Sequence, residues 1–173
     1  GVAFGGAATA ITSITEEFTS SANVITGAAW ASGGNLSTGR YYIGSTGTPT
    51  AGMVFGGYTG STYSNATEHY DGTNWTSGGA LATNTRTGCF SGPQTAAWIV
   101  GGTQPNESSL NSIYQEYDGS TWTNGPSNPT AITNGGGSGT QTLAVAFGVQ
   151  TAPAPNGATT VFKYDGTTWA TSP

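Results

Sequence analysis

Charged residues are scarce in this sequence, and basic ones are nearly absent. Only 6% of the 173 residues are charged and the net charge is −5, whereas about a quarter of the residues of a typical soluble domain are charged. The only basic residues are Arg40, Arg86 and Lys163. A nucleic-acid-binding surface needs several Lys or Arg side chains on one face, where they pair with successive phosphates. We therefore expect no nucleic-acid partner.

The residue types that carry most catalytic and metal chemistry are equally scarce. The chain has one histidine, His69, and one cysteine, Cys89. A single cysteine forms no internal disulfide, and the two residues are too few for a metal cluster. We expect an exposed strand position for His69 and a small buried role for Cys89, with no enzymatic activity, no cofactor and no metal site. No apolar run approaches the roughly 20 residues of a membrane helix, so we expect no membrane insertion.

Glycine is abundant instead, and the aromatic residues recur at fixed intervals. The hexapeptide Tyr-Asp-Gly-x-x-Trp occurs as YDGTNW at 70–75, as YDGSTW at 117–122 and as YDGTTW at 164–169, so that the copies are evenly spaced. Glycines keep a constant offset as well, because the interval from Trp30 to Gly56 equals the interval from Trp75 to Gly101. Such a period is typical of repeat architectures.

Each repeat predicts four short β-strands. An apolar run ends at the repeated glycine, at 51–55, 96–100 and 143–147, and predicts a strand that is buried on both faces. After a polar loop comes an alternating strand, in which tyrosines lie on one face and His69, Glu116 and Lys163 on the other. Asp-Gly then makes a tight turn, and the Trp opens a further strand. A four-stranded unit of this length, repeated radially, gives a β-propeller.

The predicted fold is therefore all-β, a propeller of about four four-stranded blades of ~47 residues. It occupies residues 1–173 as a single domain or as a fragment of a larger propeller. Counted from one Trp to the next, the repeats are approximately 1–29, 30–74, 75–121 and 122–168. The first repeat is partial and lacks one strand of its blade. That strand comes from residues beyond this sequence or from another subunit, or the blade is left without it.

The repeat resembles the kelch motif. A glycine pair closes an apolar strand, Tyr-Asp follows, and a Trp comes a few residues later. A kelch unit also tends to carry an Arg just before its first strand. Arg86 fits that place, and Arg40 lies one residue earlier relative to the Trp of its own repeat. The third repeat has Thr133 at this position. The sequence departs from the pattern at Val149, which replaces a glycine, and in the long segment 19–29.

A closer resemblance is to the Thr/Gly-rich kelch-like repeats in structural proteins of marine bacteriophages. It is carried by the phrases NLSTGRYYIGSTGTPTAGMVFGG, GTQTLAVAFG, GGALATNTR, TEEF and TEHYDGTNW. This resemblance implies a virion component, in a tail fibre, an appendage or a decoration. It implies other virion proteins or copies of itself as partners, and a location in the virion, with possible contact to the host surface. The alternative is a secreted or cell-surface propeller that binds carbohydrate.

Tyr58 and Tyr63 are the candidate site residues, as contacts for a glycan. They lie in the polar loop after the first glycine pair, where aromatic faces among hydroxyl and amide groups stack on sugar rings. Tyr42 fits either an exposed or a core position. The repeated aspartates, such as Asp71, are interpreted as turn-forming residues. Glu16, Glu17 and Glu68 are interpreted as solvated residues.

Overall fold

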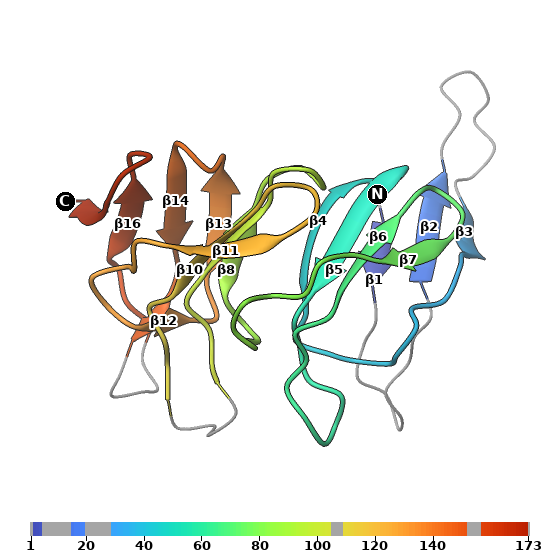
Figure 1. The fold of residues 1–173 in the computed structure, drawn as a ribbon, viewed down its shortest axis with the longest axis horizontal. Helices are drawn as coiled ribbons and strands as arrows, with labels where there is room; N and C mark the ends of the chain where they lie inside the picture. The colour runs from blue at the N-terminus through green and yellow to red at the C-terminus, as the bar shows by residue number, and fades with distance from the viewer. Residues whose placement is uncertain (1, 5–14, 20–28, 105–108, 152–156, 173) are drawn as a thin grey trace.

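The computed structural model describes residues 2–4, 15–19, 29–104, 109–151 and 157–172. Within these residues every regular secondary-structure element is a β-strand, and the strands form antiparallel sheets (Figure 1). The all-β prediction is therefore confirmed.

Three four-stranded sheets and one three-stranded sheet follow one another along the chain. The first sheet contains β1 (Val2–Phe4), β2 (Thr15–Thr19) and β3 (Ala29–Ser32). The second contains β4 (Gly44–Thr48), β5 (Ala51–Phe55), β6 (Thr67–Tyr70) and β7 (Trp75–Ser77). The third contains β8 (Cys89–Ser91), β9 (Trp98–Val100), β10 (Tyr114–Tyr117) and β11 (Trp122–Gly125). The fourth contains β13 (Gly136–Gly139), β14 (Ala144–Phe147), β16 (Val161–Tyr164) and β17 (Trp169–Ser172). A small separate ladder pairs β12 (Ile132–Thr133) with β15 (Gln150–Thr151).

The four larger sheets share one simple order, because the strands of each pair in the order in which they follow in the chain. In the fourth sheet β14 pairs with β16, since β15 belongs to the separate ladder. The sheets are offset from the Trp-to-Trp repeats, since each sheet includes the Trp strand that opens the next repeat. In Figure 1 the sheets form a row, with β8 between β4 and β13, and the first and fourth sheets lie at opposite ends of it. The row does not close on itself in the described residues.

The Asp-Gly turns form as the sequence predicts. In the β6–β7 hairpin, the Asp71 carboxylate accepts hydrogen bonds from the amides of Thr73 (2.8 Å) and Asn74 (2.7 Å). Gly72 has a φ of 96°, which only glycine adopts without strain. Tyr70 and Trp75 are directly opposite in the register, and their ring centroids are 4.9 Å apart. The hexapeptide therefore builds a hairpin whose two aromatic rings pack together.

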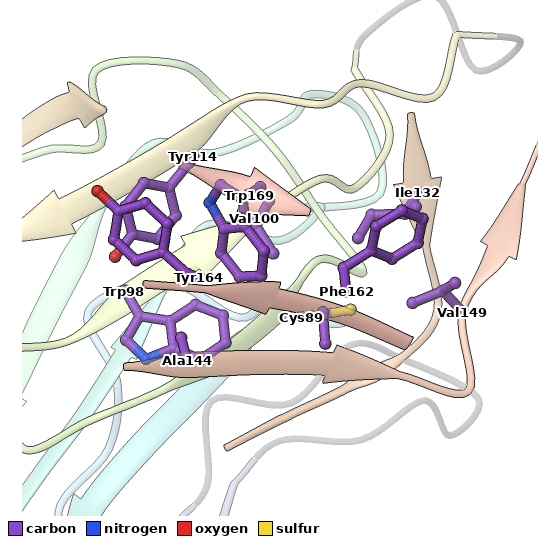
Figure 2. Close-up of a cluster of buried hydrophobic side chains, with 11 residues drawn as sticks. Cys89, Trp98, Val100, Tyr114, Ile132, Ala144, Val149, Phe162, Tyr164 and Trp169 are labelled. Atoms are coloured by element: carbon purple, nitrogen blue, oxygen red, sulfur yellow. The ribbon is translucent and has the colours of Figure 1, made fainter. Parts of the chain in front are cut away.

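Neighbouring sheets bury their apolar faces against each other. Figure 2 shows the cluster between the third and fourth sheets, where Trp98 and Tyr114 of the third meet Tyr164 and Trp169 of the fourth. The centroids of Trp98 and Trp169 are 5.9 Å apart, and those of Tyr114 and Tyr164 are 4.8 Å apart. Between the second and third sheets, the ring centroids of Phe55 and Trp122 are 4.9 Å apart. Sheet-on-sheet packing supplies most of the buried apolar surface.

The expectation that each apolar run is buried on both faces holds for two of the three runs. Every residue of β9 is buried, and so is every residue of β5 except Ala51. By contrast, Phe147 in β14 is 43% exposed, and Leu143, the residue before β14, is 69% exposed. That prediction was wrong for 143–147, because no described sheet covers the outer face of the fourth sheet.

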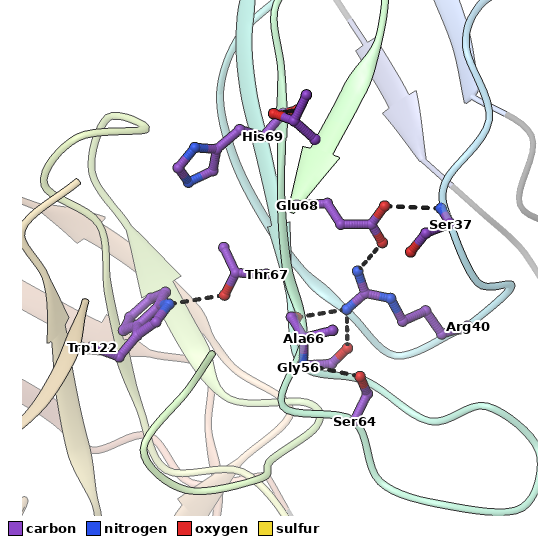
Figure 3. A network of polar contacts seen from close by, with 10 residues as sticks. Ser37, Arg40, Gly56, Ser64, Ala66, Thr67, Glu68, His69 and Trp122 are labelled. Carbon is purple, nitrogen blue, oxygen red and sulfur yellow. Dashed lines mark hydrogen bonds and ion pairs between the residues drawn. The ribbon is translucent and has the colours of Figure 1, made fainter. Parts of the chain in front are cut away.

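A buried ion pair joins the segment before β4 to strand β6. The Arg40 guanidinium lies 2.5 Å from the Glu68 carboxylate, and the two side chains are 0% and 3% exposed (Figure 3). Arg40 also donates to the carbonyls of Gly56 (2.9 Å) and Ala66 (2.7 Å), and the other Glu68 oxygen accepts from the Ser37 amide (2.8 Å). The interpretation of Glu68 as solvated was wrong, because its partner lies in a distant part of the sequence.

Phe55 and Phe147 occupy the same repeat position, which makes them a matched pair. We expect Phe55→Ala to lower the free energy of unfolding by about 3–5 kcal/mol, because it empties a fully buried site. Phe147→Ala should cost about 1 kcal/mol, because its ring is already partly in water. Urea unfolding followed by tryptophan fluorescence measures both. Equal losses would contradict the packing described here.

The Arg40–Glu68 pair predicts a second, non-additive result. Glu68→Gln should lower the free energy of unfolding by about 3 kcal/mol, because the Arg40 charge stays buried without its counter-charge. The double variant Arg40→Met, Glu68→Gln should recover at least half of this loss, since it leaves no charge inside. Urea titration of the two variants against the parent checks the prediction, and a double variant less stable than the single one would refute it.

Candidate functional site

Arg86 is the cation of a compact tyrosine cluster. Its guanidinium carbon lies 5.1 Å from the ring centroid of Tyr42, 5.4 Å from that of Tyr58 and 4.9 Å from that of Tyr63. All three distances are within the range of cation–π attraction. Tyr41 completes the cluster, with its ring centroid 5.5 Å from that of Tyr58. We call Tyr41, Tyr42, Tyr58, Tyr63 and Arg86 the tyrosine–arginine cluster.

The two tyrosines singled out from the sequence lie together in this cluster. Tyr58 and Tyr63 form an isolated β-bridge across their loop, and their rings meet edge to face at 5.3 Å. Tyr58 is half-buried and Tyr63 is only 8% exposed. They are therefore placed to support Arg86, and only Tyr58 has appreciable surface for a ligand.

Tyr42 is the exposed aromatic face of the cluster. Its side chain is 54% exposed, so of the two positions considered for it the exposed one is correct. Its backbone is unusual, since Tyr42, Thr87 and Asn134 have φ values of 57°, 59° and 56°. These residues occupy one repeat position, and they form a ladder: the Thr87 amide donates to the Tyr42 carbonyl (3.3 Å) and the Asn134 amide to the Thr87 carbonyl (2.7 Å).

A left-handed backbone costs free energy at residues other than glycine, most of all at a β-branched residue such as Thr87. Strained conformations of this kind persist where the surrounding structure enforces them, and they gather at functional sites. Here the strain accompanies an outward position of Tyr42 and Asn134, both of which are exposed.

A shallow cavity of about 210 Å³ lies beside this cluster. It is lined by Tyr42, Arg86, Thr87, Thr103 and Asn134. Arg86 Nε donates to the Thr103 hydroxyl (3.1 Å), and Asn134 Nδ2 donates to Gln150 Oε1 (2.9 Å). The cavity combines one cation, one exposed ring face, two hydroxyls and one carboxamide. The hydroxyl and carboxamide groups beside an exposed ring suit a ligand that carries hydroxyl groups.

Sequence reasoning missed Thr87, Thr103 and Asn134 as members of the cavity. Each lies far from Tyr58 in the sequence, and none is of a type that marks a site by itself. An alignment of the repeats on their glycines does place Tyr42, Thr87 and Asn134 in one column. The same alignment places Thr103 in one column with Tyr58.

His69 and Cys89 both take part in the packing of the sheets. His69 is half-buried, and its Nε2 lies 3.0 Å from the Tyr117 hydroxyl of the third sheet, so the expected exposed position is corrected to a contact between sheets. Burial lowers its pKa below the ordinary value. Cys89 is fully buried, as expected, and burial raises the pKa of its thiol to about 11, which keeps it protonated at neutral pH.

The described residues contain no group of three His, Cys, Asp or Glu side chains that could hold a metal ion. They also include no helix with the length and apolar character needed to cross a membrane. The side chains of Glu16 and Glu17 lie outside the described part.

No family model matches the chain, and no curated protein matches it.

Proposed function

We propose that this chain is a kelch-like β-propeller module of a bacteriophage particle, with a structural and non-enzymatic role in a fibre, an appendage or a decoration. The proposal joins two supports. One is the resemblance of the repeats to those of phage structural proteins, carried by phrases such as TEHYDGTNW. The other is the way in which the sheets adhere to one another.

The observation that carries the proposal is the recurrence of one uncharged contact between sheets. Gln94, in the hairpin before β9, donates from Nε2 to the carbonyls of Gly52 (2.8 Å) and Tyr70 (3.1 Å) of the second sheet. Gln141, at the same repeat position, donates to Ala97 (3.0 Å) and Tyr117 (2.7 Å) of the third. A module that fixes its second, third and fourth sheets to one another by buried rings and a carboxamide suits a rigid spacer.

The test is the native mass of the protein in its source material, measured by mass photometry. We expect the chain in assemblies of megadalton size, and we expect an antibody against it to label one appendage of the particle in electron micrographs. The matched control is the recombinant chain by itself under the same conditions. A source material that contains only small soluble species would refute the virion role.

A second candidate function is carbohydrate binding, and the tyrosine–arginine cluster favours it. The exposed ring of Tyr42 offers a face for the C–H groups of a sugar, and the hydroxyl and carboxamide groups beside it suit the sugar's hydroxyl groups. The ligand class is therefore a polysaccharide. The same surface also serves a virion protein that contacts a host glycan.

Titration calorimetry with a polyuronate oligosaccharide, and with a neutral oligosaccharide of equal length, tests this candidate. Tyr42→Asn should weaken binding at least about tenfold, because it removes the ring while asparagine tolerates the left-handed backbone, as Asn134 does at the same repeat position. Phe147→Ala is the control, since it removes an exposed ring on another sheet. The absence of binding to both sugars, or no effect of Tyr42→Asn on binding, would exclude this site.

A further inference from the structure

One face of the fourth sheet repeats a surface whose largest apolar residues are fully buried in the second and third sheets. Phe55, Val100 and Phe147 occupy the same position, just before the repeated glycine. Phe55 and Val100 are 0% exposed, whereas Phe147 is 43% exposed. Two residues earlier, Met53 and Trp98 are 0% exposed, whereas Val145 is half-buried.

In the second and third sheets this face is covered by the sheet that follows in the chain. Phe55 contacts Phe90 and Trp122 of the third sheet, with centroids 5.8 Å and 4.9 Å away. Trp98 contacts Trp169 of the fourth sheet, 5.9 Å away. The fourth sheet has no described neighbour on this side. We call its outer residues, Ser138, Leu143, Val145, Phe147 and Lys163, the terminal face.

The glutamine contact between sheets identifies an empty counterpart on the terminal face. The carbonyl acceptors of Gln94 belong to Gly52 and Tyr70, which are opposite each other in the register of the second sheet. In the fourth sheet the same register pairs Ala144 with Tyr164. These two residues, together with Leu143, Val145 and Lys163, line a cavity of about 280 Å³. The cavity lies where the next glutamine would be held.

The terminal face also offers a hydroxyl group for a second polar contact between sheets. The Thr46 hydroxyl of the second sheet donates to the Gly92 carbonyl in the hairpin of the third. Thr46 is opposite Met53 in its register, and Ser138 is opposite Val145 in the fourth sheet. Ser138 thus offers an exposed hydroxyl at the position of Thr46. Gly92 and Gln94 are two residues apart, so one hairpin supplies both partners.

We propose that the terminal face binds a partner sheet of this same repeat, whose first hairpin carries Gly-x-Gln. Its glutamine carboxamide enters the cavity and donates to the Ala144 and Tyr164 carbonyls, and its glycine carbonyl accepts from Ser138. An aromatic residue at the position of Trp122, where the fourth sheet itself carries Trp169, covers Phe147 and Val145. This inference rests on the sheet-to-sheet packing invoked for the proposed propeller, and it specifies what continues the row.

The chemistry favours a complete four-stranded sheet over the first sheet of a second copy. The glutamine hairpin precedes the strand that corresponds to β5 and β9. In the first sheet that strand is β1, and no hairpin precedes it among the described residues. The hairpins that hold Gln94 and Gln141 are already engaged within the chain.

The experiment supplies such a sheet by fusion. A second copy of residues 126–173 is appended to the full chain, and Val145→Cys is introduced in the original part as a reporter. Because Cys89 is fully buried, labelling by a maleimide reports on position 145. We expect the labelling rate to fall at least about tenfold in the extended chain, compared with the unextended chain carrying the same substitution. Ala80→Cys, at an exposed position, should label at the same rate in both chains.

The role of the carboxamide is tested by Gln141→Ala in the appended copy alone. We expect this change to restore at least half of the lost labelling rate, because two buried carbonyls lose their donor. Unchanged labelling after extension would overturn the proposal, and so would an appended sheet that stays unfolded by hydrogen exchange, since the same sequence folds against the third sheet. Protection of the unextended chain that grows with concentration, at twice the monomer mass, would show a second copy on this face and would also overturn it. None of these outcomes bears on whether the chain is found in virus particles.

Discussion

The constraint that governs this structure is that a four-stranded sheet with two apolar faces is stable only between neighbours. Strands such as β5 and β9 carry apolar residues on both sides, so one sheet leaves half of them in water. The chain meets this constraint by repetition, because the same sheet is placed face to face with the next one. The Trp98 and Phe55 contacts are two instances of one solution. Turn geometry, loop length and the polar contacts all serve this packing.

The polar contacts vary more among the repeats than the apolar ones. The hairpin glutamine is present at 94 and 141, but Pro49 stands at that position in the second sheet. Glu68 in β6 corresponds to Gln115 in β10, and each accepts a hydrogen bond from the backbone of the segment before its own sheet, from Ser37 and Thr83. Only Glu68 needs a buried cation as well. The repeats therefore share an acceptor at the position of Glu68 and Gln115, whereas the hairpin glutamine is absent from the second sheet.

Local features were predictable from the sequence and long-range ones were not. The Asp-Gly hairpins and the paired Tyr and Trp rings follow from six consecutive residues, so their pattern sufficed. The burial of Glu68 depends on Arg40, and the cavity at Tyr42 on Asn134, which are distant in the chain. Phe147 is the clearest case. Its sequence context matches that of Phe55, yet its exposure depends on whether another sheet lies beside it, which no pattern within the repeat encodes.

The two surfaces of interest occupy different parts of the molecule, with the tyrosine–arginine cluster in the loops at the strand ends and the terminal face on the flat of the last sheet. The sheets adhere through rings, glutamine carboxamides and hydroxyls, and the described ion pair lies within one repeat, sealed from water. Dissolved ions screen exposed charges but barely touch such contacts. Cohesion through these rings, carboxamides and hydroxyls thus depends little on ionic strength, and this packing is suited to dilute buffer and to brine alike.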